Sequence, residues 1–164
     1  VTRDAGFDSL SLDPQNPGPW AVRINELTKL QDINSTNLSA FHQRGGKLLM
    51  AHGTADVLVS TRATAQYYER LKQTMGAATV QNFARYYEVP GYGHAVSTAF
   101  NANWDSLKAL DAWVTKGQAP TGQVVSDTAG VPGRTRPLCE YPSWPRYNGS
   151  GDVNKAESFS CVAN

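Results

Sequence analysis

Two short strand-like runs, each followed by a loop and then by a segment with helical periodicity, constrain the fold of this chain most. The first run covers residues 47–51 and the second, rich in aromatic residues, covers residues 83–89. A continuous apolar run bounded by glycines, as in the first, is typical of a fully buried strand in a parallel sheet. The order strand, loop, helix, strand, loop, helix therefore predicts an α/β fold with parallel strands and flanking helices.

The two helices are predicted from apolar residues that recur every three or four positions. The first is expected between a cap at Ser60 or Thr61 and Gly76, with one shared face made by Thr64, Tyr68, Leu71 and Met75. The second is expected from a cap at Asn103 to Gly117, and the residues it should bury are Trp104, Leu107, Leu110 and Val114.

The segments on either side of this core have weaker patterns. Residues 1–46 are predicted to be an entry segment with short helices at about 20–30 and 38–41, and residues 120–164 a loop-rich tail. Both cysteines, Cys139 and Cys161, lie in the tail without a His or a second Cys at metal-ligand spacing. A disulfide that closes the tail is therefore favoured over a metal site.

Charge and hydropathy exclude two classes of partner. The formal net charge is +1, with scattered Lys and Arg, so the sequence does not predict binding to nucleic acid. No apolar run approaches the roughly 20 residues that span a bilayer, so a membrane partner is not expected. A disulfide persists in an oxidising compartment, and sequons at Asn34, Asn37 and Asn148 are compatible with export, so we expect a secreted or periplasmic protein.

Candidate catalytic residues follow the two predicted strands. Asp56 lies in the loop after the first strand and His94 in the loop after the second. Because catalytic groups collect at the carboxyl edge of open α/β sheets, we expect the two side chains to lie side by side. A carboxylate that accepts a hydrogen bond from imidazole fixes its tautomer and stabilises its protonated form, so His94 would be the base and Asp56 the acid that orients it.

Structural interpretations of the same residues remain open. Asp56 could be a turn residue that caps the following helix, and His94 could be a histidine held in a tight glycine turn. His52 is predicted to be structural, with its ring hydrogen-bonded within the loop. In α/β-hydrolases a serine in a G-x-S-x-G elbow precedes the Asp and the His, and no such elbow precedes Asp56 in this sequence. Ser150 lies downstream without the strand and helix of an elbow, so we reject it as the nucleophile.

Five sequence blocks resemble the tannase and feruloyl esterase family of α/β-hydrolases. The blocks are GGKLLMAHGTAD at 45–56, YYER at 67–70, VPGYGH at 89–94, RTRPLCEYP at 134–142, and RYNGSGD at 146–152 with FSC at 159–161. The resemblance covers about residues 13–161 and implies the carboxyl-terminal part of a serine esterase that acts on esters of aromatic acids, such as feruloyl or galloyl esters.

The resemblance also implies roles and boundaries. Asp56 and His94 match the acid and base of a Ser-His-Asp triad, and Cys139 with Cys161 matches the terminal disulfide. Residues 1–46 would be the end of a lid and the return to the catalytic domain, 47–119 part of the hydrolase core, and 120–164 the tail. The serine, the oxyanion hole and a lid with a structural calcium would all precede the matched segment, so no cofactor or metal is expected within it.

The expected partners are a small aromatic ester and the amino-terminal part of the same protein. We expect residues 1–164 alone not to turn over ester, because an oxyanion hole alone contributes roughly a hundredfold to a thousandfold in rate. One departure from the family is Ala95, which stands where a cysteine usually follows the histidine. The alternative function is a non-catalytic binding or structural module on the same scaffold.

Overall fold

The computed structural model describes residues 1–97 and 99–163 of the chain, which form two compact units, Val1–Ser35 and Thr36–Asn164. The first unit contains two 3-10 helices, η1 (Ser9–Ser11) and η2 (Gly18–Trp20), and helix α1 (Ala21–Gln31). Within it, the rings of Phe7 and Trp20 pack edge to face at 5.9 Å between centroids. The short helix expected at about residues 20–30 is thus present.

A parallel pair of strands lies at the centre of the second unit. Strand β1 (Leu48–Gly53) pairs with β2 (Ala84–Val89) in a register that runs from Leu48 opposite Ala84 to Gly53 opposite Val89. Helix α2 (Ser39–Gln43) precedes β1, and helices α3 (Thr61–Met75) and α4 (Ala77–Gln81) connect the two strands. The predicted parallel α/β arrangement is confirmed, and α3 has the predicted bounds.

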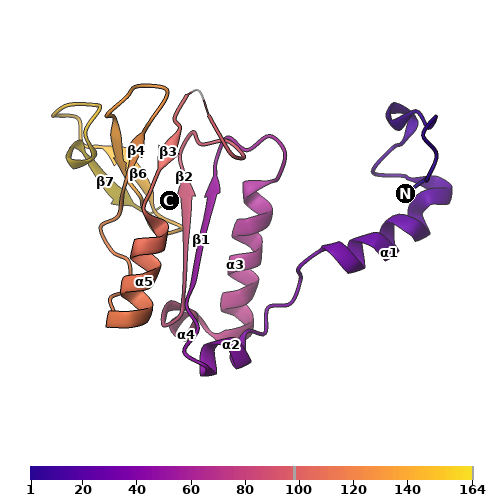
Figure 1. Ribbon diagram of the computed structural model, residues 1–164, viewed down its shortest axis with the longest axis horizontal. Coiled ribbons are helices and arrows are strands. Elements are labelled where there is room, and N and C mark those ends of the chain that lie inside the picture. The colour runs from indigo at the N-terminus through magenta and orange to yellow at the C-terminus, as the bar shows by residue number, and fades with distance from the viewer. Residues whose placement is uncertain (98, 164) are drawn as a thin grey trace. The chain divides into compact units, whose positions relative to one another are not determined.

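Helices cover both faces of this strand pair (Figure 1), with α3 on one side and α5 (Ser106–Lys116) on the other. On the α3 side, Tyr68 and Leu71 pack with Phe83 and Tyr86. The core on the opposite face consists of Tyr87, Val89, Phe100, Val125 and Leu138. Side chains that alternate between the two faces of β2 therefore belong to two separate cores.

Strand β1 is not the fully buried strand that its apolar run predicts. Leu48, Leu49 and Met50 are half-buried and Ala51 is exposed, whereas most of β2 is buried. Among the described strands only β2 pairs with β1, while β2 also contacts the tail, where Tyr141 N–H donates to the Tyr86 carbonyl. The burial of β1 is incomplete because one of its edges lacks a neighbouring strand among the described residues.

Helix α5 corrects two sequence predictions. It begins at Ser106 with Asp105 as the cap, whose carboxylate accepts from the Lys108 N–H, and Asn103 lies in strand β3 (Ala102–Asn103) instead. The predicted buried residues Leu107 and Val114 are exposed, at 79% and 58% of the residue surface, and Trp113 is buried. The helix turns the large indole inward, because its burial removes more apolar surface from water than a leucine does.

The tail forms short antiparallel strands, which the sequence patterns did not predict. In the tail, β4 (Val124–Asp127) pairs with β5 (Thr135–Pro137) and also with β3, which precedes α5. Strand β6 (Trp144–Tyr147) pairs with β7 (Phe159–Val162), which follows the 3-10 helix η3 (Ala156–Ser158). Strands of two to four residues are too short to show an alternating pattern. The predicted disulfide joins Cys139 to Cys161, with 5.5 Å between their Cα atoms.

The predicted division at residues 46 and 119 remains a prediction, since the structure separates units only between Ser35 and Thr36. None of the helices in residues 1–97 and 99–163 is long and apolar enough to span a bilayer.

Candidate active site

The loops that follow β1 and β2 are joined by hydrogen bonds between their backbones. Thr54 N–H donates to the Val89 carbonyl and Ala55 N–H to the Tyr92 carbonyl, both at 3.0 Å. The Thr54 hydroxyl in turn accepts from Gly91 N–H at 2.9 Å. The carboxyl ends of the parallel strands thus continue into loops that hold each other in place.

Glycine at position 53 permits this close approach. A Cβ atom built on Gly53 would lie 2.2 Å from the Tyr92 carbonyl oxygen and 2.6 Å from that of Gly93. These contacts are with backbone atoms, which have little room to move. Any larger residue at position 53 would therefore force the two loops apart.

The two loops bring together the residues that the sequence singled out. His94 Nδ1 lies 2.9 Å from Asp56 Oδ2, the distance of a hydrogen bond in which the imidazole N–H donates to the carboxylate. The Asp56 side chain is 4% exposed and that of His94 is 51% exposed. The carboxylate is therefore enclosed, and the imidazole it orients faces open space.

Asp56 is held as an anion by several donors. Its Oδ1 accepts from Leu58 N–H at 2.8 Å and from Val59 N–H at 2.9 Å. The Val59 N–H is the largest influence on the pKa of Asp56 and lowers it; burial acts in the opposite direction. Hydrogen bonds from His94, Leu58 and His52 lower it further, so the Asp56 pKa lies well below its usual range. Asp56 can accept hydrogen bonds throughout the neutral pH range.

A second histidine reaches the same carboxylate, which the sequence did not predict. His52 Nε2 lies 3.0 Å from Asp56 Oδ2, and its Nδ1 lies 2.7 Å from the hydroxyl of Thr64 on α3. The prediction that the His52 ring bonds within the loop is correct, but its partner is the candidate acid. The spacing of four residues between His52 and Asp56 around a tight turn is the signal that could have indicated this contact.

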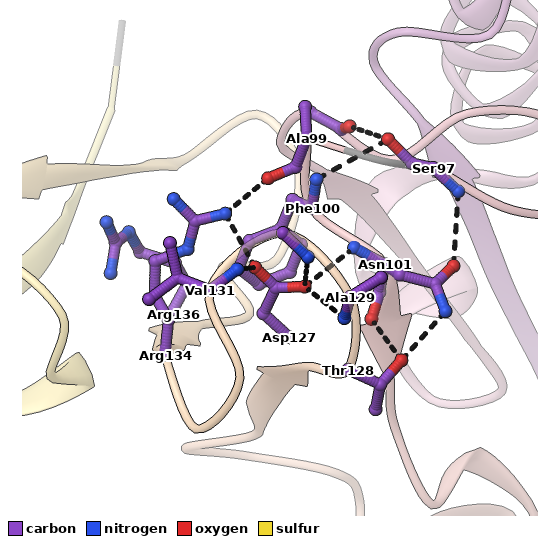
Figure 2. Close-up of polar contacts among 12 residues, drawn as sticks. Ser97, Ala99, Phe100, Asn101, Asp127, Thr128, Ala129, Val131, Arg134 and Arg136 are labelled. Carbon is purple, nitrogen blue, oxygen red and sulfur yellow. Dashed lines mark hydrogen bonds and ion pairs between the residues drawn. The ribbon is translucent and has the colours of Figure 1, made fainter.

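The segment after His94 is fastened to the tail through Asp127, a buried residue at the end of β4 (Figure 2). Asp127 Oδ1 accepts from Asn101 N–H at 3.0 Å, and the Asn101 side chain accepts from Ser97 N–H at 3.1 Å. The Ser97 hydroxyl donates back to the carbonyl of Gly91 at 3.0 Å. This chain of contacts links the histidine loop to the antiparallel sheet.

Asp127 also organises the turn that follows it. Its carboxylate accepts from the N–H groups of Ala129, Gly130 and Val131 and from the guanidinium of Arg134, which lies 2.6 Å away. Burial raises the pKa of Asp127, but the backbone donors outweigh it and keep the pKa well below its usual range. Arg134 additionally donates to the carbonyl of Ala99, so its guanidinium joins the tail to the segment after His94.

A cavity of about 450 Å³ lies beside the Asp56–His94 pair, and its lining includes His52, Tyr92 and Trp104. Within residues 1–97 and 99–163, no group of three or more His, Cys, Asp or Glu side chains is placed to hold a metal ion. The resemblance to the family implies a structural calcium in the lid. No described residue of this chain is assigned to that calcium.

Two other residues that the sequence analysis named lie outside the Asp56–His94 pair. Ser150 is exposed in the tail, in the turn between β6 and η3, and Ala95 is an exposed residue of the histidine loop. The chemical groups that the loops assemble are thus an anionic acceptor and an oriented imidazole. Such a pair can take a proton from a nucleophile and return it to a leaving group.

Comparisons with known proteins give one consistent result. A family model described as tannase and feruloyl esterase matches residues 1–162. The chain is 43% identical over 164 residues to an uncharacterized esterase from Agrobacterium fabrum. The aligned region covers 99% of this chain and 30% of that relative. The chain is 44% identical over 135 residues to a mono(2-hydroxyethyl) terephthalate hydrolase from Piscinibacter sakaiensis, in an alignment that covers 79% of this chain and 22% of that protein.

Solved structures show the same fold. Feruloyl esterase B from Aspergillus oryzae superposes with a TM-score of 0.83 at 24% identity, over 99% of this chain and 35% of the other. The tannin acyl hydrolase from Aspergillus niger gives a TM-score of 0.77 at 25% identity, over 96% of this chain and 30% of the other. This chain spans between 22% and 35% of the length of these relatives.

Proposed function

The chain belongs to the tannase and feruloyl esterase family, and we propose that it supplies the acid and base of a serine carboxylesterase that cleaves esters of aromatic acids. The observation that carries the proposal is the hydrogen bond of 2.9 Å between His94 Nδ1 and Asp56 Oδ2. It leaves the other ring nitrogen, Nε2, to exchange a proton with the nucleophile. The expected substrates are feruloyl, galloyl or related esters.

The proposed reaction has two halves. In the first, a serine from another part of the same protein attacks the ester carbonyl while its proton passes to His94 Nε2. The tetrahedral intermediate collapses, the alcohol leaves with the proton from His94, and an acyl-enzyme remains. In the second half, water attacks the acyl group, His94 accepts the proton of that water and returns it to the serine, and the aromatic acid leaves.

Asp56 acts without becoming protonated. Its carboxylate accepts the Nδ1–H of His94 and stabilises the positive charge that the ring acquires in both halves of the reaction. The donors around Asp56 keep it anionic, so the proton remains on His94, from which it must be returned.

We further propose that residues 1–164 act only together with the rest of the protein. The nucleophile and the oxyanion hole are assigned to segments outside this chain, so residues 1–164 alone should not turn over ester. The Cys139–Cys161 disulfide supports a secreted or periplasmic location, because such bonds persist in oxidising compartments.

The test uses the complete protein and methyl ferulate as substrate. His94→Ala should leave folding intact and reduce turnover by roughly three orders of magnitude or more. His42→Ala is the matched control, since His42 lies on α2, at the opposite end of β1 from the site, and this variant should keep its turnover.

A fluorophosphonate label identifies the nucleophile in the same protein. It should attach to a serine outside residues 1–164, in a G-x-S-x-G sequence. Unchanged turnover in His94→Ala, or a label on a residue of this chain, would contradict the proposal.

A further inference from the structure

One carboxylate oxygen of the candidate acid lies within hydrogen-bond distance of two histidines. Asp56 Oδ2 lies 2.9 Å from His94 Nδ1 and 3.0 Å from His52 Nε2. A carboxylate anion only accepts hydrogen bonds, so both rings must donate to it, each through the nitrogen that faces it. The tautomer of His52 is therefore assigned: Nε2 carries the proton that points at Asp56.

The His52 ring is itself anchored. With its proton on Nε2, neutral His52 accepts at Nδ1 from the hydroxyl of Thr64, 2.7 Å away on helix α3. The His52 side chain is only 12% exposed, so water competes little for either ring nitrogen. A continuous line of hydrogen bonds thus runs from α3 through Thr64, His52 and Asp56 to His94.

The two oxygens of Asp56 depend on different supports. Oδ1 is held by backbone N–H groups of its own loop, those of Leu58 and Val59. Without His52, the remaining donor to Oδ2 among the described residues would be His94, the group that gains and loses a proton in the proposed reaction. His52 supplies a donor to Oδ2 that does not take part in the proton transfer.

We propose that His52 is a positioning residue for ester hydrolysis, which holds Asp56 Oδ2 in place for His94 and connects it to helix α3. This inference rests on the proposed function, because it assumes that the Asp56–His94 pair carries the reaction. A packing role would need only the shape of the side chain. A positioning role needs the N–H group at the place of Nε2.

Two substitutions of similar size separate these roles in the complete protein. His52→Gln can place an amide N–H where the imidazole Nε2 stands, and His52→Met has the same chain length without a donor. With methyl ferulate, His52→Met should lower kcat by roughly tenfold to a hundredfold, the range for a lost hydrogen bond to a charged group, and change KM less than twofold. His52→Gln should recover most of kcat.

Substitutions of Thr64, at the α3 end of this line of hydrogen bonds, provide a second test. This test remains valid even if His52→Met does not fold. Thr64→Val removes the hydroxyl that His52 Nδ1 meets and keeps the shape, whereas Thr64→Ser keeps the hydroxyl. We expect a severalfold lower kcat for Thr64→Val and an unchanged kcat for Thr64→Ser. Equal kcat in the Gln and Met variants, or in the Val and Ser variants, overturns the inference.

The same assay separates this inference from the proposed function. If Asp56→Asn and His94→Ala abolish turnover while the two His52 variants have equal kcat, only the positioning role of His52 fails. If Asp56→Asn and His94→Ala keep their turnover, the proposed function fails, and the positioning role of His52 fails with it.

Discussion

At the scale of single residues, the site depends on how closely two loops approach. Asp56 and His94 are 38 positions apart, and they meet because the loop after β1 lies against the loop after β2. Gly53 makes this possible, since its missing side chain leaves room for the carbonyl groups of Tyr92 and Gly93. The geometry of the proposed acid and base therefore depends on a residue without a side chain of its own.

Gly53→Ala should disturb the site more than the fold. The added methyl group must push the loops apart, and small misplacements of catalytic groups cost up to about a hundredfold in rate, so we expect kcat to fall at least roughly tenfold. The measurement is kcat of the complete protein with methyl ferulate. Gly6→Ala is the control, because its Cβ would meet nothing nearer than 3.5 Å. Wild-type kcat in Gly53→Ala would refute this account of the glycine.

The sequence predicted the pairing of Asp56 and His94 because both follow strands of a parallel sheet, whose carboxyl ends share one edge. It did not predict that His52 bonds to Asp56. Whether the ring at the end of β1 turns toward the loop or toward solvent depends on Thr64, which lies on a helix twelve residues later. The spacing of four residues permits the contact between His52 and Asp56, but the packing of α3 on the sheet, which no local pattern encodes, decides whether it forms.

At the scale of elements, the histidine loop is held by the tail as well as by the sheet. Asp127, at the end of β4, accepts from the backbone of Asn101 and from that of the turn at 129–131 (Figure 2). Arg134 pairs with it and reaches the carbonyl of Ala99. We infer that the tail stabilises the loop that presents His94.

Asp127→Asn should loosen this loop. An amide accepts only through its oxygen, so the substituted side chain cannot satisfy the donors to both oxygens of the carboxylate. Either Val131 N–H and the Arg134 guanidinium, which bond to Oδ2, or the N–H groups of Asn101, Ala129 and Gly130, which bond to Oδ1, would lose their acceptor. Hydrogen exchange measured by mass spectrometry should become faster in peptides that cover residues 95–101 and 128–131. Asp111→Asn, an exposed position on α5, is the control and should leave exchange unchanged. Unaltered exchange in Asp127→Asn would show that the carboxylate does not anchor the loop.

The same residue predicts a pH dependence of stability. Because folding lowers the pKa of Asp127, its contribution is complete above the pKa of an unfolded aspartate, about 3.9, and is lost as pH falls toward the folded value. The stability difference between wild type and Asp127→Asn should therefore be constant near neutral pH and shrink below about pH 4. Urea unfolding from pH 3 to 7 measures it. A difference that grows on acidification would contradict this assignment.

The elements themselves were predictable to different degrees. Helix α3 was predicted well, because a long apolar face and Gly76 mark its extent. The start of α5 was not, since Asn103 and Asp105 are both suitable caps and only tertiary contacts choose between them. The strands of the tail are stabilised by pairing with distant segments, such as Ala102 with Asp127, so no local period identifies them.

At the scale of the whole molecule, a disulfide closes the tail. Cys139 and Cys161 are 22 positions apart, and Leu138 beside the first belongs to the core shared with Tyr87 and Val89 of β2. The bond therefore ties the β6–β7 hairpin to the part of the chain that packs on the central strands. The resemblance and the spacing of the cysteines predicted this bond, and the structure confirms it.

Cys139→Ser with Cys161→Ser should destabilise the protein without altering the site. Closing a loop of this length contributes about 3 kcal/mol in the chain-entropy model. We expect a lower midpoint of thermal unfolding and an unchanged kcat at temperatures well below it. The same midpoint with and without both cysteines would show that the bond has no stabilising role.

The central claim is that Asp56 and His94 act as one unit in ester hydrolysis. Its most direct test is a double-mutant cycle on kcat in the complete protein, with Asp56→Asn, His94→Ala and the combination of both. Groups that act as a unit have strongly non-additive effects, so the double variant should be no slower than His94→Ala alone. Losses that multiply, with each substitution reducing kcat by the same factor in the presence and absence of the other, would contradict the claim.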